Sequence, residues 1–156
     1  MTQHALSSYI IDVSIRGVDP RSQLCEHQAG HNLPVTTVIF FQEAPGKTPS
    51  LIEWLDGLPA KAQRKCLARL KRLEDLGHEL RRPEADYLGD GIYELRATYQ
   101  GVHYRMLYFF HGRAKVVVSH GIVKEREVPS TEIDVAVRTK EAFEADPTSH
   151  TFRPGR

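Results

Sequence analysis

Cysteine is scarce in this sequence, with two among 156 residues. Two cysteines are too few for the disulfide framework of a small secreted protein, and Cys66 falls inside a helical pattern, which favours a reducing, cytoplasmic setting. No window is long and apolar enough to span a membrane, and the N-terminal residues lack a basic segment followed by a long apolar run. We therefore expect neither export nor a membrane partner.

Strong charge of one sign and familiar nucleotide-binding motifs are also missing. The formal net charge is +1, so overall charge does not indicate a partner, and any electrostatic argument depends on where charges cluster. No G-x-S-x-G motif, P-loop or dinucleotide-binding glycine motif occurs. The sequence therefore does not support the hypothesis of a hydrolase, an NTPase or a Rossmann-fold protein. The spacing Cys25-x-His27-x3-His31 offers three metal-ligand types but no fourth ligand, so we predict no metal and no cofactor.

The length and composition suit one soluble domain with its own core. Residues 1–34 are weakly patterned, and we expect a loosely ordered extension there. Residues 35–146 carry the periodic apolar pattern of a folded domain. We predict that the polar tail, residues 147–156, is disordered.

Within the domain, the patterns predict an α+β fold. A strand over 35–43 is followed by a short helix from Ser50, which Gly57 and Pro59 end, and by a second helix over about 59–76, which Gly77 ends. Residues 78–90 read as a polar connector. Three strands and a final helix from Pro129-Ser130 complete a small twisted antiparallel sheet with an N-terminal strand, a helical hairpin, a three-strand meander and a C-terminal helix.

The meander is the most informative stretch. Runs 92–99, 102–110 and 115–123 are rich in β-branched and aromatic residues, and Gln100-Gly101 between the first two predicts a two-residue hairpin loop. That loop places Arg96 opposite Arg105. A loop at 112–113, or at 111–114, makes Arg105 the neighbour of His120, and the period of two extends the same face to Lys124.

Opposed arginines carry an energetic cost that suggests a site. Like charges facing each other destabilise a sheet by a few tenths to about 1 kcal/mol, so we expect an anion or a carboxylate between Arg96 and Arg105. The other face is apolar and suited to packing on helices, with residues such as Tyr93, Met106 and Val117. The pattern thus predicts one core face and one functional face.

A second basic feature lies before the meander. Residues 59–82 contain eight basic and three acidic side chains. A solvated helix face is the common meaning of such a run, and contact with nucleic acid is the alternative. The candidate RNA-binding residues on the helix are Lys61, Arg64, Lys65, Lys71 and Arg72.

Three blocks at specific spacing resemble a known family. They are L-G-D-G-I-Y-E-L-R-A-T-Y-Q-G-V-H-Y-R-M-L-Y-F-F, then S-H-G-I-V-K, then P-S-T-E-I-D-V-A-V-R. Over about residues 35–144 the sequence resembles the phage-derived Gp49-like or HigB-like branch of the RelE/ParE toxin superfamily. The resemblance implies the toxin of a type II toxin–antitoxin system, most often a ribosome-dependent, metal-independent endoribonuclease that cleaves mRNA and inhibits translation. It also implies a helix-turn-helix antitoxin, the ribosome and mRNA as partners.

The family's motifs also imply site residues. Arg96 stands at the arginine of E-L-R, Arg105 at that of Y-R-x-x-Y, and Lys124 at the first lysine of a K-K pair. The sequence departs from the family at the second lysine, which is Glu125. It departs again at Glu94 on the first meander strand, where RelE itself carries lysines.

Cleavage of RNA through its 2′-hydroxyl requires a base, an acid and cations on the phosphate. Arg96, Arg105 and Lys124 suit the cationic task. His120 is our first choice for proton transfer because its expected arginine neighbour favours the neutral, proton-accepting form. The other available groups are His103, Glu94, Glu125 and Tyr108.

Each of these residues also has a structural interpretation. Arg96 can pair with Glu94 or Glu127, and His120 can simply make a hydrogen bond at a strand end. Two other functions remain open from the sequence. One is a ParE-like toxin that inhibits DNA gyrase without cutting, and the other is an inactive relative that only binds RNA or a partner.

Overall fold

The computed structural model describes residues 35–124 and 126–155. The expected extension 1–34, with Cys25, His27 and His31, and the substituted lysine position Glu125 lie outside these ranges. Residues 35–153 form one compact unit. Its elements are β1 (Thr37–Phe41), α2 (Ser50–Asp56), α3 (Ala60–Leu76), the 3₁₀ helix η1 (Gly77–Glu79), β2 (Ala85–Gly89), β3 (Ile92–Tyr99), β4 (Val102–His111), β5 (Lys115–Val123), α4 (Ser130–Ala145), α5 (Pro147–His150) and β6 (Thr151–Phe152).

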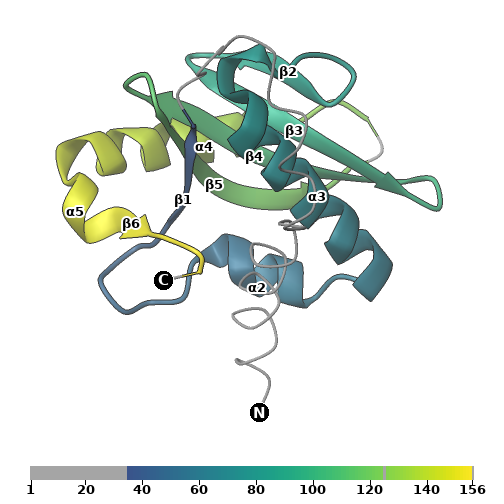
Figure 1. The fold of residues 1–156 in the computed structure, drawn as a ribbon, viewed down its shortest axis with the longest axis horizontal. Helices are drawn as coiled ribbons and strands as arrows, with labels where there is room; N and C mark the ends of the chain where they lie inside the picture. Colours follow the sequence, from purple (N-terminus) through teal and green to yellow (C-terminus); the bar gives the residue numbers. More distant parts are fainter. Residues whose placement is uncertain (1–34, 125, 156) are drawn as a thin grey trace, which may run out of the picture. The chain divides into compact units, whose positions relative to one another are not determined.

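The strands form one six-stranded sheet in the order β2-β3-β4-β5-β1-β6 (Figure 1). The three expected meander strands β3, β4 and β5 are antiparallel neighbours, as predicted. The N-terminal strand β1 pairs in parallel with β5, with Thr37 opposite Lys115, and so extends the sheet beyond the meander. The observed α+β architecture, mostly antiparallel with a C-terminal helix, agrees with the predicted RelE-like fold.

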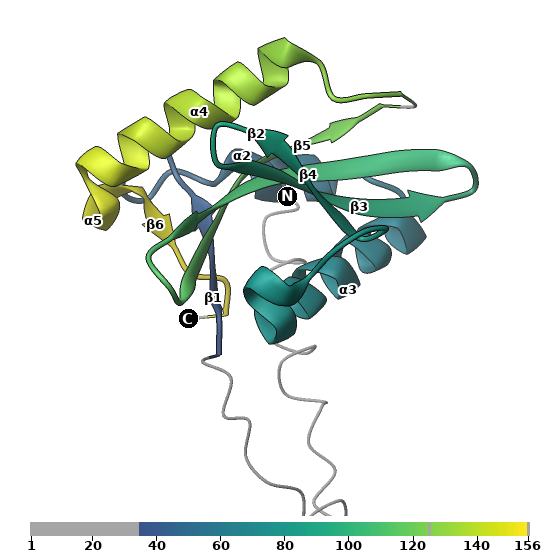
Figure 2. The same cartoon turned by 90° about the horizontal axis from the view of Figure 1, so that it is seen from above.

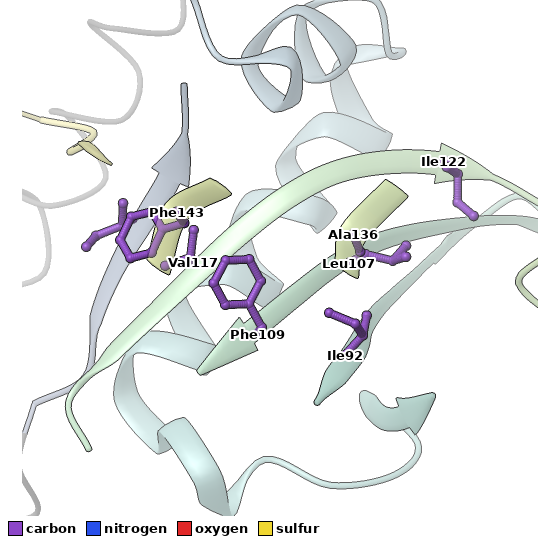
Figure 3. Close-up of a cluster of buried hydrophobic side chains, with 8 residues drawn as sticks. Ile92, Leu107, Phe109, Val117, Ile122, Ala136 and Phe143 are labelled. Atoms are coloured by element: carbon purple, nitrogen blue, oxygen red, sulfur yellow. The ribbon is translucent and has the colours of Figure 1, made fainter. Parts of the chain in front are cut away.

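Helices cover both faces of the sheet. Figure 2 shows α4 on one side and α3 on the other, and α2 packs on β5. Under α4, a cluster of buried side chains joins four of the strands to the helix (Figure 3), among them Ile92, Leu107, Phe109, Val117 and Phe143. The expectation of one core face and one functional face is therefore wrong in part, because the α4 side is core at one end and polar at the other.

The β4–β5 register differs from the prediction. His111 pairs with Lys115 across a three-residue loop, and a bulge between Leu107 and Tyr108 adds one further residue on β5. Arg105 consequently lies opposite Ile122, and His120 lies opposite Leu107. Val117 falls on the α4 side rather than the α3 side. Bulges insert a residue without a strong sequence signal, which is why the hydrophobic pattern alone gave the wrong partner.

Residues 147–152, which we expected to be disordered, form α5 and β6. The carboxylate of Asp146 accepts hydrogen bonds from the backbone N–H and the hydroxyl of Ser149, which caps α5. The Gln42 amide donates to the carbonyl oxygens of Ser149 and Thr151, and Phe152 stacks on Phe40. These long-range contacts hold a segment whose polar composition alone predicts disorder.

The connector before the meander also contains an unexpected strand. Tyr87 of β2 lies opposite Tyr93 of β3, and their rings are 4.9 Å apart. Because β2 pairs with the first half of β3 only, it becomes a short edge strand of the sheet. This short length shapes the site described next.

Candidate functional site

A cleft opens beside β3 at the point where β2 begins. The backbone N–H of Arg96 donates to the carbonyl of Glu84, and beyond this point β3 has no neighbouring strand on that side within the described residues. The cleft has a volume of about 720 Å³. Its polar lining is mostly cationic or titratable, contributed by α3, the turn before β2, β3 and β4: Lys65, Arg69, Glu84, Arg96, Thr98, His103 and Arg105.

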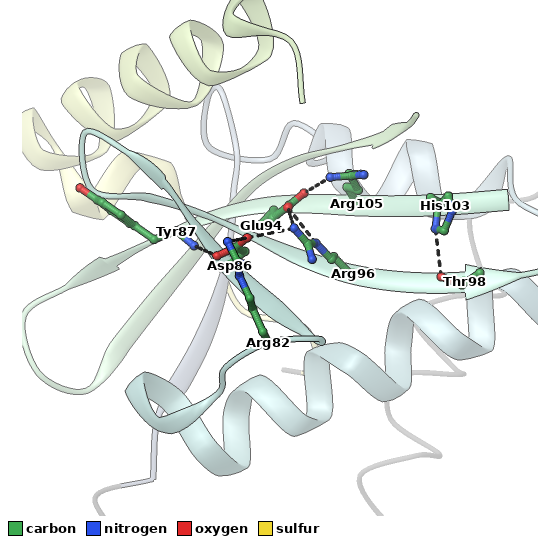
Figure 4. A network of polar contacts seen from close by, with 8 residues as sticks. All are labelled: Arg82, Asp86, Tyr87, Glu94, Arg96, Thr98, His103 and Arg105. Atoms are coloured by element: carbon green, nitrogen blue, oxygen red, sulfur yellow. Dashed lines mark hydrogen bonds and ion pairs between the residues drawn. The ribbon is translucent and has the colours of Figure 1, made fainter. Parts of the chain in front are cut away.

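Arg96 and Arg105 face each other across β3 and β4, as predicted. The expected carboxylate between them is Glu94, which is 1% exposed (Figure 4). Its Oε1 accepts from Nε of Arg96 at 2.8 Å, and its Oε2 accepts from Nη1 of Arg105 at 2.6 Å. One carboxylate oxygen thus serves each guanidinium and offsets their mutual repulsion. The interpretation of Arg96 as a partner of Glu94 is correct.

A second carboxylate extends this network. Asp86 Oδ2 accepts from Arg82 Nη2 at 2.7 Å and from Arg96 Nη2 at 3.0 Å. The hydrogen bond from Arg82 is the largest cause that lowers the pKa of Asp86, and the charges of Arg82 and Arg96 act in the same direction. Three arginines and two carboxylates therefore form one cluster, which we call the arginine network: Arg82, Asp86, Glu94, Arg96 and Arg105.

The Arg105 side chain is buried more deeply than that of Arg96, with 12% of its surface exposed against 35%. Its Nε is buried and has no hydrogen-bond partner among the described residues. An N–H group in that position costs free energy unless an acceptor reaches it. Arg105 lines the cleft, and within the described residues its Nη1 donates to Glu94 while its Nη2 makes no hydrogen bond, which leaves donor capacity for an anion there.

His103 lies next to the arginines on the cleft wall. It is opposite Thr98, whose hydroxyl is 3.2 Å from its Nδ1, and it is exposed. The backbone N–H of Lys124 donates to the His103 carbonyl, so Lys124 lies immediately beyond the end of β5 next to this histidine. The cleft lining therefore brings together Arg96, Arg105 and His103, whereas Lys124 is outside the lining and reaches His103 through its backbone.

His120 is positioned differently from the prediction. Its Nδ1 is 2.8 Å from the Ser119 hydroxyl and its Nε2 is 2.9 Å from Oε2 of Glu132 on α4. It does not line the cleft, and Arg105 is not its cross-strand neighbour. The serine is 2% exposed, so the Ser119–His120–Glu132 chain of contacts presents no accessible nucleophile. In this arrangement His120 ties β5 to the first turn of α4.

The basic side chains of α3 divide into three groups. Lys65 and the neighbouring Arg69 donate to the carbonyls of Thr98 and Arg96, and so cap the open edge of β3. Arg72 pairs with Glu84, and Lys71 pairs with Glu74 and Asp75 of its own helix. Lys61 and Arg64 are exposed and make no hydrogen bond or ion pair within the described residues. The role of Arg69 was missed from sequence because helix periodicity cannot show which cations reach the strand edge.

Tyr108, one of the available acid–base groups, is buried on the α3 side and lies outside the cleft. Burial raises the pKa of its hydroxyl well above the usual range, which makes it a poor base. Within residues 35–124 and 126–155, no group of three or more His, Cys, Asp or Glu side chains is arranged to hold a metal ion. No helix in this part of the chain has the length and apolarity needed to cross a membrane.

The sheet, the flanking helices and the C-terminal helix define a RelE-like α+β protein. A comparison with protein families matches residues 53–141 to the family described as Phage derived protein Gp49-like (DUF891). The chain belongs to this family, which is a branch of the RelE/HigB-like toxins. The family suggests a toxin of a toxin–antitoxin pair, with an antitoxin as its partner. A search of curated proteins finds no match.

Proposed function

We propose that the protein is the toxin of a type II toxin–antitoxin system and acts as a ribosome-dependent mRNA endoribonuclease. The observation that carries the proposal is the pair of opposed arginines, Arg96 and Arg105, on the wall of a cationic cleft beside an exposed histidine. Guanidinium groups bind phosphate oxygens through paired N–H donors and stay charged at any working pH. The arrangement suits a phosphodiester that enters the cleft from solvent.

In the proposed reaction, His103 accepts the proton of the 2′-hydroxyl. The 2′-oxygen attacks the phosphorus, the bond from phosphorus to the 5′-oxygen breaks, and the leaving oxygen takes a proton from solvent. The products are a 2′,3′-cyclic phosphate and a 5′-hydroxyl. Imidazole suits this role because it changes charge between pH 5 and 8. Arg96 and Arg105 stabilise the negative charge that builds on the phosphate.

Glu94 has a positioning role in this proposal. It holds the two guanidinium groups on one carboxylate at the wall of the cleft. Lys65 and Arg69 add positive charge on the α3 side of the cleft. Lys124, whose backbone contacts His103, adds positive charge near the cleft.

The test is induction of the chain with and without its antitoxin, followed within minutes by mapping of new RNA 5′ ends after enzymatic phosphorylation of 5′-hydroxyls. We expect growth arrest and new ends within translated codons. His103→Ala should abolish the new ends, whereas Arg113→Ala, in the exposed β4–β5 turn, should leave them unchanged. Growth arrest without new RNA ends would refute the nuclease and favour the gyrase-inhibiting alternative.

Arg105→Ala alone is a poor test because it leaves Glu94 buried with one fewer partner. The double variant Glu94→Gln, Arg105→Gln removes the cation and its counter-charge together. It should be folded and should produce no new RNA ends. A folded double variant that still cuts RNA would show that Arg105 is not part of the site.

A further inference from the structure

A second hollow lies next to the arginine network, on the other side of β2. It has a volume of about 350 Å³ and is lined by Leu80, Arg81, Arg82, Ala85, Asp86, Tyr87 and Tyr93. The volume lies within the range of small-ligand sites. We call it the tyrosine pocket and propose that it binds a nucleobase of the RNA whose phosphate occupies the cationic cleft. This inference rests on the proposed function.

Tyr87 is the first reason. Its side chain is one of the most exposed large groups of the described chain, at 56%, yet its position is fixed. Its hydroxyl accepts a hydrogen bond from the Gly91 backbone N–H at 3.1 Å, and its ring packs on Tyr93. The polar end of the side chain is therefore directed into the β2–β3 turn, and a ring surface is presented to solvent without the entropy loss of ordering it on binding.

The ring behind Tyr87 is part of a continuous aromatic stack. Tyr93 stacks on Tyr108 with ring centres 5.4 Å apart and meets Phe110 edge-to-face at 5.3 Å. The stack extends to His78, whose ring lies 3.6 Å from that of Phe110. A base placed on Tyr87 would thus stack on a rigid platform rather than on one mobile side chain.

Charge around the pocket favours RNA over an apolar partner segment. Arg81 and Arg82 are both exposed at its rim, and guanidinium groups stack on bases and bind phosphates. A docking groove for an apolar peptide would instead be lined by aliphatic side chains. Within the lining, Leu80 and Ala85 are aliphatic, and both are buried.

The pocket is also connected to the cleft. Asp86 Oδ2 accepts from Arg82, at the pocket, and from Arg96, in the cleft. The two guanidinium groups share this single acceptor atom and therefore lie beside each other, as Figure 4 shows. One strand of RNA can place a phosphate on Arg96 and turn the adjacent base past Arg82 onto Tyr87.

The experiment compares two fluorescent probes bound to the purified full chain at low salt: a short single-stranded RNA, and an abasic strand with the same ribose-phosphate backbone. Anisotropy gives both affinities. Tyr87→Ala should weaken binding of the RNA about ten-fold, the order expected for loss of one stacked base, and should leave the abasic strand unchanged. Tyr87→Phe keeps the ring but loses the hydrogen bond from Gly91, so it should bind the RNA more tightly than Tyr87→Ala and should bind the abasic strand like the wild type.

The Glu94→Gln, Arg105→Gln variant separates the two proposals, because it should weaken binding of both probes. If it does so while Tyr87→Ala matches the wild type on both probes, the tyrosine pocket is refuted and the phosphate site stands. If the wild type binds neither probe, the tyrosine pocket is refuted. The ribosome-dependent nuclease, to which the ribosome presents the RNA, is then decided by the mapping of RNA 5′ ends. If Tyr87→Ala lowers affinity for the antitoxin and not for RNA, the pocket belongs to a protein partner and the inference is overturned.

Discussion

The arginine network predicts that the Glu94→Gln substitution strongly destabilises the fold. Glutamine keeps the size of the side chain and one acceptor oxygen, but it removes the charge that Arg96 and Arg105 share. Its amide group would also place N–H donors against a guanidinium that has no acceptor to offer. The substitution therefore isolates the electrostatic contribution of one buried carboxylate.

The magnitude follows from how deeply each partner is buried. Removal of one member of a buried ion pair costs about 3–5 kcal/mol. The Arg105 side chain is 12% exposed and is therefore close to fully buried. The Arg96 side chain is 35% exposed and keeps Asp86 as a second partner. We therefore expect the lower end, about 3 kcal/mol, which corresponds to a drop in Tm of about 10 °C for a domain of this size.

Urea denaturation of the wild type and of Glu94→Gln measures this difference directly. Adding Arg105→Met should recover part of the loss, because the double variant no longer buries an uncompensated guanidinium. Glu43→Gln is the matched control, since Glu43 pairs with Lys47 on the exposed surface and loss of this pair should leave the midpoint unchanged. A Glu94→Gln variant as stable as the wild type would refute the network as a stabilising element.

Three further predictions follow from individual contacts. Gly121→Ala should destabilise the fold by about 1–3 kcal/mol because its methyl group would overlap the Trp54 indole. Gly57→Ala, with φ of −78° and the Trp54 carbonyl oxygen at an ordinary contact distance of 3.5 Å, should be nearly neutral in urea denaturation. Burial raises the pKa of Cys66 to about 12, so in a Cys25→Ser background the thiol should react with an aromatic disulfide reagent at pH 8 only after unfolding; fast reaction of the folded protein would contradict this. The pKa of Asp86 is lower in the folded state than in the unfolded state. Its stabilising contribution is therefore present at a pH above the pKa of the unfolded state, and it is lost as the pH falls through the pKa of the folded state. Asp86→Asn should therefore flatten the loss of stability below about pH 4, and an unchanged acid unfolding curve would count against the Arg82–Asp86 pair.

The turn residues in the sequence were sufficient to predict the strand register of the β3–β4 hairpin but not that of the β4–β5 hairpin. Gln100-Gly101 defines a tight loop, and the pairing of Arg96 with Arg105 follows from it by counting. At the other end, a three-residue loop and a bulge shift the register of β5, so His120 meets α4 instead of Arg105. Register errors of this kind arise wherever both faces of a strand are buried, because Val116, Val117 and Val118 fit either side equally.

The site residues that the sequence left unassigned depend on tertiary contacts. From the sequence His103 was one of several available acid–base groups, and only the short length of β2, which leaves the edge of β3 open, places it on the cleft wall. The regular structure of residues 147–152 depends on hydrogen bonds from Gln42, which is more than 100 positions away in the sequence. Tyr87 sat in an apparent connector, and its stacked, anchored position appears only when β2 pairs with β3.

The most direct test of the central claim is single-turnover cleavage of a defined mRNA bound to purified ribosomes. The account predicts that the wild type cuts the ribosome-bound mRNA within a codon and leaves a 5′-hydroxyl, and that it leaves the free mRNA intact. The rate should fall about 100-fold or more in His103→Ala and should be retained in Arg113→Ala. Intact mRNA under these conditions, with a folded toxin that still arrests growth, would contradict the proposed nuclease.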